Sequence, residues 1–335
     1  MYFRKYIDII HEAIGSLIPN DVQYALFDFP NHPNVGDSSI WLGEKRYLKE
    51  KIQGRVLIVD DLSMLHRKLP ELPKETLIFI HGGGNLGDLW PWHQSLRERV
   101  INHYYQNRII QFPQSIHFQD SRNFEHCRKV FNKHQDFHLV VRDYQSLELA
   151  KKLHDGPTYL APDMALCLGD FPRTAVPSYP ILGLLRTDKE NIDKDHDSID
   201  SKIFYTDWRH EPNSLTKYLN ARLEKLLNKY PRKMYMLNIM KPHFYNRLAL
   251  ERHKRGCDIL SSGEVVISNR LHGHILCTLM GIPHVVLDNI YRKIGNFRDT
   301  WSTGEGLCRT ASNLQDALIK ARELVEEHES SFDGE

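Results

Sequence analysis

Short runs of β-branched and aromatic residues alternate with amphipathic helical patterns over most of this chain of 335 residues. Strands that alternate with helices are typical of βαβ units, in which the strands are parallel and the helices cover the sheet. The first half of the sequence predicts strands at 22–27, 55–59, 76–80, 108–112, 138–141 and 158–160. It predicts helices at 39–50, 92–105, 122–132 and 144–153. The alternation therefore favours an α/β fold with a mainly parallel sheet.

This pattern stops around Pro172 and Pro177, where we place a linker, and then resumes. The second half predicts strands at 180–185, 233–239, 265–268 and 284–287, and helices at 215–229, 247–260, 271–280 and 312–327. Because so long a chain exceeds one ordinary hydrophobic core, we predict two Rossmann-like domains that face each other across a cleft. They comprise residues 1–175 and 176–335, and the C-terminal helix is free to pack back on the first domain.

Charge and hydropathy exclude several classes of protein. The formal net charge is only +1, so no net positive field would draw the chain onto nucleic acid. No stretch approaches the roughly 20 apolar residues that span a bilayer, and the N-terminus lacks the apolar core of a signal peptide, so we expect a cytoplasmic protein.

The five cysteines form no CxxC pair, which argues against a zinc ribbon or a disulfide framework. Cys277 lies in an apolar helical run and is expected in the core.

Two segments have two interpretations each. Apolar residues between Phe3 and Leu17 share one face of a helix, which either docks on the core or makes a weak contact with a membrane surface. Residues 188–200 are densely charged and form either a solvated loop or a lid over a substrate.

Ligands of open parallel sheets bind beyond the carboxyl ends of the strands, so the segments that follow strands are candidates for chemistry. The first is Asn34-Val-Gly-Asp37. Either Asp37 or Ser38 caps a helix that opens at Ser38–Ser39, or Asp37 presents a carboxylate that accepts a proton from a sugar hydroxyl. Gly36 would let the backbone approach a ligand closely.

The second candidate is Ile80-His-Gly-Gly-Gly-Asn85. Three consecutive glycines are costly in chain entropy, so bare backbone is expected to be required there. Their N–H groups could face an anion, or the missing side chains could leave room for a sugar ring. The segment lacks a Walker lysine and does not match GxGxxG. We expect Gly83, Gly84 and Asn85 to bind substrate.

The third candidate is the strand, turn and helix around Asn269-Arg-Leu-His-Gly-His274. Arg270, Leu271 and His272 fall where the helix begins, and helix N-termini favour anions. An arginine fork and an imidazole suit the same place to a phosphate or carboxylate. Alternatively, Arg270 pairs with a carboxylate elsewhere and His272 caps the helix. His272 and His274 diverge on a helix, so we expect no metal pair.

The fourth candidate is Arg186, at the carboxyl end of the predicted strand 180–185. This position would direct its guanidinium into the same cleft as Arg270. A surface salt bridge is the alternative interpretation.

In their order along the chain, several short motifs together resemble the polysaccharide pyruvyl transferase family. They are Asn31-His-Pro-Asn-Val-Gly-Asp37, His81-Gly-Gly-Gly-Asn85, Gln111-Phe-Pro-Gln114, Val141-Arg-Asp143, Ala161-Pro-Asp163, Arg186 and Asn269-Arg-Leu-His-Gly-His274. The resemblance implies a fold like that of two-domain GT-B glycosyltransferases, with phosphoenolpyruvate as co-substrate, no cofactor and no metal. The first domain would hold the acceptor and the second the phosphoenolpyruvate.

The resemblance also implies roles for single residues. Arg186, Arg270 and the backbone of Leu271 would bind the donor, and Lys293 would complete the phosphate site. His272 would be the catalytic acid, and Asp37 would be the acidic group on the acceptor side. Many relatives have an acidic residue where this chain has Ser268-Asn269, so a negative charge is missing beside Arg270.

The function implied is transfer of the enolpyruvyl group of phosphoenolpyruvate to a sugar, forming a pyruvate ketal and releasing phosphate. The acceptor would belong to a surface polysaccharide or its lipid-linked oligosaccharide precursor, which leaves peripheral membrane association and oligomeric state open. One alternative is a nucleotide-sugar glycosyltransferase of the same architecture, for which Glu264 is the nearest candidate ribose-binding carboxylate. The other is an inactive sugar-binding protein of polysaccharide assembly.

Overall fold

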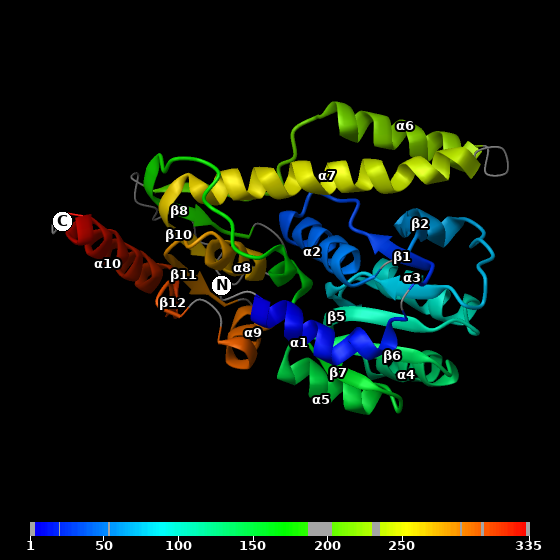
Figure 1. Ribbon diagram of the computed structural model, residues 1–335. Helices are drawn as coiled ribbons and strands as arrows, with labels where there is room; N and C mark the ends of the chain where they lie inside the picture. Colours follow the sequence, from blue (N-terminus) through cyan, green and yellow to red (C-terminus); the bar gives the residue numbers. More distant parts are fainter. Residues whose placement is uncertain are drawn as a thin grey trace.

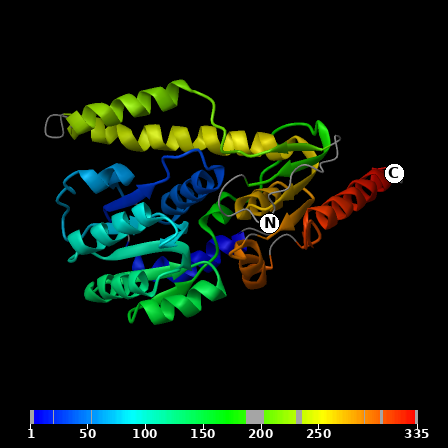
Figure 2. The same ribbon diagram turned by 180° about the vertical axis from the view of Figure 1, so that it is seen from behind.

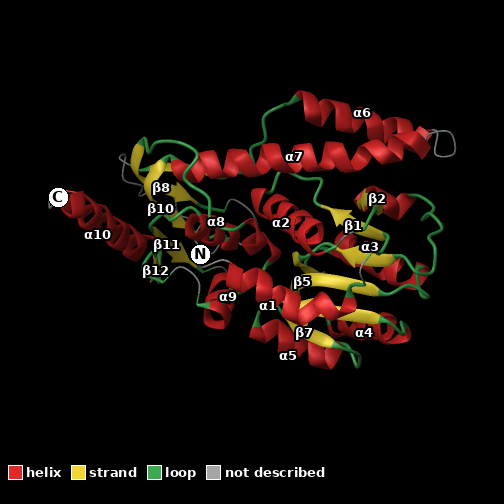
Figure 3. Cartoon of the chain, viewed as in Figure 1, coloured by secondary structure: helices red, strands yellow, loops and turns green. Residues whose placement is uncertain are grey.

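The computed structural model describes residues 4–19, 21–52, 54–186, 203–229, 235–288, 290–302 and 305–332, and these contain two separate parallel sheets (Figure 1). Helices flank both sheets (Figure 3). The predicted α/β fold with parallel sheets is therefore confirmed. The GT-B arrangement and the boundary between residues 175 and 176 stay predictions. The charged stretch 188–200 lies outside the described residues.

The first sheet has the strand order β2-β1-β3-β5-β6-β7, and β4 pairs with β5. Its strands are β1 Tyr24–Phe29, β2 Val56–Asp61, β3 Leu77–Ile80, β4 Gly83–Gly87, β5 Ile109–His117, β6 Phe137–Val141 and β7 Thr158–Leu160. The helices that accompany them are α1 Arg4–Ile14, α2 Val35–Lys51, α3 Pro91–His103, α4 Ser121–Lys133 and α5 Tyr144–Leu153. Short 3₁₀ turns lie at Gly15–Leu17, Leu62–His66 and Met164–Leu168.

Alternate residues of each strand point to opposite faces, and both faces of the first sheet are buried. Leu26, Phe79 and Ile110 belong to a hydrophobic cluster with α1 and α2. Their neighbours Phe27 and Ile80 belong to a second cluster with α3, α4 and α5. This two-sided burial explains why these strands are near-continuous apolar runs.

The second sheet has the order β12-β11-β10-β8-β9. Its strands are β8 Tyr179–Leu184, β9 Phe204–Thr206, β10 Gly263–Ser268, β11 His284–Leu287 and β12 Cys308–Ala311, and its helices include α8 Leu271–Leu279, α9 Lys293–Trp301 and α10 Leu314–Phe332. Ala317, Ala321 and Leu324 of α10 pack on this sheet in a third hydrophobic cluster. The C-terminal helix therefore covers the second sheet and does not return to the first, because its apolar face is already buried.

Helices α6 Leu215–Lys229 and α7 Tyr235–Ser261 pack side by side, and α7 extends along both sheets (Figures 1 and 2). The predicted strand at 233–239 is wrong, since residues 235–239 are the first turns of α7. A short apolar run fits a strand or a buried helix equally well. The helix contacts β2 and α2 on one side and β10 and α8 on the other. Buried Lys241 anchors it, with its Nζ 2.6 Å from Asp60 Oδ1 and 3.3 Å from Glu224 Oε1.

Burial settles two smaller expectations, on α1 and on Cys277. Tyr6, Ile10 and Ile14 of α1 are buried against the first sheet, so the helix docks on the core and its apolar face is not available to a membrane. Cys277 is fully buried, as expected. Within the described residues, no helix combines the length and apolar character needed to span a bilayer.

Candidate active site

A cavity of about 300 Å³ lies at the carboxyl ends of strands from both sheets. This volume is at the lower end of the range for small-molecule sites. The first sheet contributes Pro30, His32, Pro33, Asn34, Asp37, His81, Gly84, Asn85, Trp90, His93 and Arg142. The second contributes Arg186, Trp208, Arg209, Arg270, Leu271, His272 and Lys293. Loops after parallel strands thus meet in one place, as the topology predicts.

Positive charge dominates the lining of this cavity. Among the described residues it includes five permanent cations, Arg142, Arg186, Arg209, Arg270 and Lys293, and one carboxylate, Asp37. Arginine forks and ammonium groups bind phosphates and carboxylates. The site is therefore suited to a small, highly charged anion.

Arg270 is both part of the cavity and part of an ion pair. Its Nη2 donates to Asp207 Oδ2 at 2.7 Å, and its guanidinium lies over the Trp208 ring, 5.7 Å from the ring centroid. The alternative that Arg270 pairs with a carboxylate elsewhere is therefore what the structure shows. Asp207, which follows β9, supplies the negative charge that the sequence lacks at Ser268-Asn269. The pair fixes the plane of the guanidinium beside the cavity.

Arg186 is tied to the same segment through its backbone. Its N–H donates to Asn269 Oδ1 at 2.8 Å. The ends of β8 and β10 are thus locked together, which brings Arg186 and Arg270 to one cavity. The sequence suggested only that an acidic residue is missing at Ser268-Asn269. The structure shows that Asn269 positions the backbone of Arg186.

His272 lies in the first turn of α8 and does not cap it, because the N-cap residue is Arg270 and no side chain caps the helix. The imidazole Nε2 lies 3.4 Å from Asp163 Oδ2. Arg142 Nη1 donates to the same oxygen at 2.6 Å. Burial alone would raise the pKa of Asp163, but the charges of His272 and Arg142 hold this pKa well below its usual range. The carboxylate therefore stays ionised beside His272.

Gly36 leaves the space that the His272 ring occupies. A Cβ atom at Gly36 would lie closer to the imidazole than atoms can pack. Gly36 was expected to admit a ligand, but the group it admits is this histidine from the other sheet.

Asp37 is not a helix cap. Helix α2 begins at Val35, earlier than predicted, and the Asn34 side chain caps it by accepting from Gly36 N at 3.2 Å. Asn34 Nδ2 also donates to Asp37 Oδ2 at 2.7 Å. Burial alone would raise the pKa of Asp37, but the neighbouring His32, His272 and His81 lower it overall. Near neutral pH Asp37 is therefore a carboxylate that faces the cavity and is 26% exposed.

The glycine-rich segment forms β4 and not an open loop. Gly83 has a φ of +120° and packs beside Ile40, and it is absent from the cavity lining. Gly84 does line the cavity, and a Cβ there would meet Arg142 Nη2 at 2.9 Å and Lys293 Nζ at 3.6 Å. Bare backbone at Gly84 thus lets two cations from different sheets approach each other.

Asn85 lines the cavity, but its amide is held by the protein. Its Oδ1 accepts from Arg97 Nη2 at 2.6 Å and from Gln114 Nε2 at 2.9 Å, while its Nδ2 donates to Asp28 Oδ2 at 3.3 Å. Asp28 is buried with a φ of +71°, a strained conformation for a residue other than glycine and one that often occurs at functional sites.

The sequence did not single out the histidines on the first-sheet side of the cavity. All four cavity histidines lie near a carboxylate, in the pairs His32–Asp37 at 3.5 Å, His81–Glu44 at 2.9 Å, His93–Asp28 at 2.8 Å and His272–Asp163 at 3.4 Å. Arg142 and Arg209 were also missed as site residues. The position of Arg142 directly after a predicted strand was the signal that could have found it.

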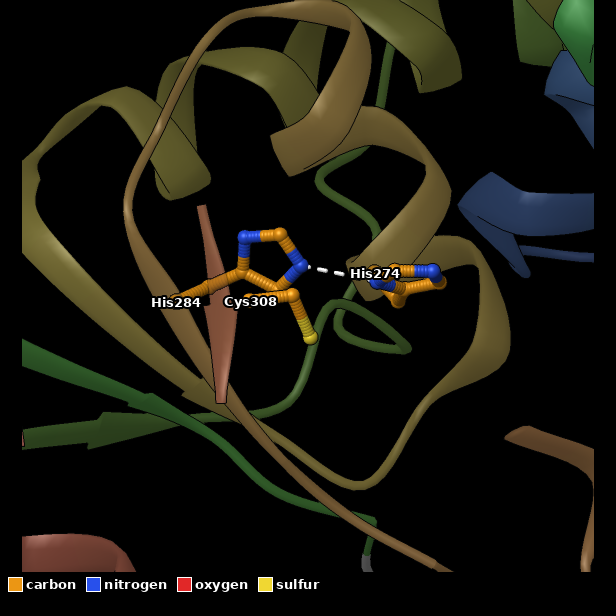
Figure 4. Close-up of side chains that lie close together, drawn as sticks. All are labelled: His274, His284 and Cys308. Carbon is orange, nitrogen blue, oxygen red and sulfur yellow. Dashed lines mark hydrogen bonds between the residues drawn. The ribbon is translucent and has the colours of Figure 1, made fainter. Parts of the chain in front are cut away.

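His274 of α8, His284 of β11 and Cys308 of β12 form a separate cluster, in which both histidines are buried and Cys308 is half-buried (Figure 4). His274 Nδ1 and His284 Nε2 are 2.8 Å apart, and His284 Nδ1 donates to Ile282 O at 2.8 Å. Two nitrogens on tetrahedral zinc would be about 3.3 Å apart, given Zn–N bonds of about 2.05 Å. Burial lowers the pKa of His284 to about 4 and raises that of Cys308 to about 11, so these groups are neutral. We interpret the cluster as a hydrogen-bonded anchor for α8.

Comparisons with known proteins agree on one family. A family model described as polysaccharide pyruvyl transferase matches residues 34–291. Pyruvyl transferase 1 of Schizosaccharomyces pombe is 34% identical over 314 residues, which cover 90% of this chain and 75% of that protein. EpsO of Bacillus subtilis, which carries a provisional pyruvyl transferase name, is 31% identical, with 86% of this chain and 88% of that protein covered. A solved structure of a functionally uncharacterised Klebsiella pneumoniae protein shares the fold, with a TM-score of 0.54 at 17% identity over 83% of this chain and 87% of that one.

Proposed function

Because the chain belongs to the polysaccharide pyruvyl transferase family, we propose that it transfers the enolpyruvyl group of phosphoenolpyruvate to a sugar hydroxyl pair. The products are a cyclic pyruvate ketal and inorganic phosphate. The acceptor is a sugar of a surface polysaccharide or of its lipid-linked precursor, held on the first-sheet side in a GT-B arrangement. A cytoplasmic location stays a prediction.

The observation that carries this proposal is the charge of the cavity. Phosphoenolpyruvate has a carboxylate and a phosphate that contributes about −1.5 to −2 near neutral pH. Among the described residues, the five lining cations outnumber Asp37 together with Asp163 and Asp207, the carboxylates that pair with Arg142 and Arg270. This leaves an excess of two positive charges, and together with the positive N-terminus of α8 it nearly balances the charge of phosphoenolpyruvate.

The neighbours of each cation suggest where the two anionic groups bind. Arg142, Lys293 and the bare backbone of Gly84 converge and suit the phosphate. Arg186 and Arg270, joined through Asn269, together with the N-terminus of α8 at Leu271, suit the carboxylate.

The chemistry follows from the groups that remain. His272 as imidazolium, supported by Asp163, protonates the enol carbon and creates an oxocarbenium-like centre. Asp37 accepts the proton of the attacking sugar hydroxyl. The arginines and Lys293 stabilise the departing phosphate by preorganised charge.

A nucleotide-sugar glycosyltransferase fits the cavity less well. The candidate ribose-binding residue Glu264 is exposed near the amino end of β10, whereas the cavity lies at the carboxyl ends. The charged groups gathered around Asp37 also argue against an inactive sugar-binding protein, because sugar binding alone does not require them.

The test is incubation with phosphoenolpyruvate and a panel of glycosides, with ketal formation measured by mass and phosphate release measured in parallel. Phosphoenolpyruvate should raise the melting temperature, and uridine or guanosine diphosphate sugars should not. Stabilisation by a nucleotide sugar, with no ketal formed from any acceptor, would contradict the proposal.

A further inference from the structure

Ketal formation requires proton transfers in two successive halves of the reaction. The acceptor loses two protons, one for each new C–O bond, while the enol carbon gains one and the departing phosphate gains the other. His272 and Asp37 account for the first addition. In the second half one proton must reach the departing phosphate and one must leave the second hydroxyl, and these transfers fall either to Asp37 and His272 in their changed protonation states or to a further group of the cavity. The inference below rests on the proposed function.

His81 has the geometry for this task. It follows β3 at the cavity and is only 2% exposed. Its Nδ1 lies 2.9 Å from Glu44 Oε2, and Gly82 N donates to the other Glu44 oxygen at 2.8 Å. Its Nε2 has no hydrogen-bond partner among the described residues. A buried polar atom without a partner is costly, so this nitrogen is expected to meet a ligand.

Helix α2 and β5 hold this arrangement in place. Asp37 and Glu44 are seven residues apart on α2, so they share one face of the helix. Asp37 lines the cavity, and Glu44 lies fully buried behind His81. The carbonyl of His81 accepts from Gln111 Nε2 at 2.8 Å and from Gln114 Nε2 at 3.0 Å. Hydrogen bonds therefore hold His81 in place at both its imidazole ring and its backbone carbonyl.

The charges that face His81 favour its protonated form. Burial alone would lower its pKa, but Glu44 and Asp37 from α2 and Asp28 from β1 raise the pKa overall. Arg97 of α3 offsets part of the Asp28 charge, and His272 of α8 also interacts with Asp37. By contrast, burial lowers the pKa of His32 to about 4, so that ring is neutral.

We propose that His81, charged through its ion pair with Glu44, is a second catalytic acid–base group of the cavity. Its Nε2 gives a proton to the departing phosphate and then takes the proton of the second sugar hydroxyl. Glu44 is a positioning residue that holds the charge and orientation of the ring.

The proton count closes with this assignment. In the first half, His272 protonates the enol carbon, the first hydroxyl oxygen bonds to the adjacent carbon, and Asp37 takes the hydroxyl proton. In the second half, the bond from that carbon to the phosphate oxygen breaks, and His81 protonates this oxygen. The second hydroxyl oxygen then bonds to the carbon, and its proton returns to His81. Proton transfer from Asp37 through solvent to His272 restores the starting state, and no oxidant is consumed.

The first experiment compares His81→Gln with the wild type. The glutamine amide can still donate to Glu44 but cannot carry a proton through the reaction. Ketal formation and phosphate release should fall about 100-fold or more, while stabilisation by phosphoenolpyruvate is retained. His138→Gln is the matched control, because His138 pairs with Asp136 at 2.8 Å at the amino end of β6, away from the cavity. Its turnover should equal that of the wild type.

The second experiment is Glu44→Gln, which removes the charge but keeps the shape. Loss of the carboxylate should lower the pKa of His81, so the basic limb of the pH–rate profile should move to lower pH by about one unit or more. Titration of the His81 ring by NMR measures the same pKa directly and needs no acceptor. A purely structural role would leave the pH–rate profile unmoved even where the pKa of the His81 ring measured by NMR falls.

The outcomes separate the two proposals. A wild type that forms no ketal overturns the proposed function. A wild type that forms the ketal, with His81→Gln near normal turnover or with the basic limb unmoved in Glu44→Gln, overturns the role of His81 alone.

Discussion

The Nε2 atom of His272 lies 3.4 Å from Oδ2 of Asp163, although His272 follows a strand of the second sheet and Asp163 follows a strand of the first. The candidate catalytic acid, His272, therefore gains its carboxylate partner only when the two halves of the chain are packed together. This relationship makes the proton chemistry of the cavity sensitive to how the sheets are joined.

Asp163→Asn should reduce both turnover and stability at pH 7. The charges of His272 and Arg142 outweigh burial and hold the pKa of Asp163 low, so its stabilisation is present above the unfolded pKa of about 3.9. It is lost as pH falls toward the lower folded pKa. We expect a loss of about 3 kcal/mol in unfolding free energy at pH 7, shrinking below about pH 4. Urea denaturation across this range measures it. Asp299→Asn, in an exposed pair with Arg292, should change stability by less than about 0.5 kcal/mol at every pH.

Gly36→Ala should impair the enzyme through His272 and not through the ligand. The added methyl group would displace the imidazole, so both stability and turnover should fall. In a His272→Ala background the clash disappears, and the same substitution should cost much less stability. Denaturation of all four proteins in a double-mutant cycle measures this coupling. Equal costs in the two backgrounds would show that the ring does not occupy this space.

Arg270→Lys should raise the KM for phosphoenolpyruvate about tenfold or more, because an ammonium cannot replace a fork that contacts Asp207 and a ligand at once. Asp207→Asn should act in the same direction by releasing the guanidinium. Steady-state kinetics with varied donor measure both. Arg309→Lys, in an exposed pair with Glu323 and Glu327, should leave KM unchanged.

Removal of metal ions should not affect the protein. His274 and His284 already satisfy each other by a hydrogen bond shorter than the spacing of two zinc ligands (Figure 4). Dialysis against a chelator should therefore leave the melting temperature and the turnover unchanged. A fall in melting temperature that zinc reverses would instead make these residues and Cys308 a structural metal site.

Much of the secondary structure could be predicted from the period of the apolar residues and the length of each segment. The segments α5, α6, β7 and β11 begin and end where the sequence predicts. The strand prediction at 233–239 was wrong because so short an apolar run has no period that separates a strand from a buried helix. It missed β4 because glycines predict turns, although pairing with β5 holds them extended.

The candidate site was predicted only as far as positions after strands can be recognised. Arg186, Arg270 and His272 meet in one cavity because the carboxyl ends of parallel strands share an edge. Their partners could not be predicted, since Asp207 and Asp163 are far from them in sequence. The sequence shows that a carboxylate exists, but not which cation the folded chain brings to it.

Helix α7 has a mechanical consequence for this cavity. One continuous helix packs on both sheets, so the walls of the cavity cannot separate as independent rigid bodies. Any widening that admits a large acceptor must bend α7 or detach one of its ends. Pro242, next to the Lys241 anchor, removes one backbone hydrogen bond, so we expect α7 to bend at that turn. We therefore expect the stiffness of α7 to limit the size of the acceptor that the cavity takes.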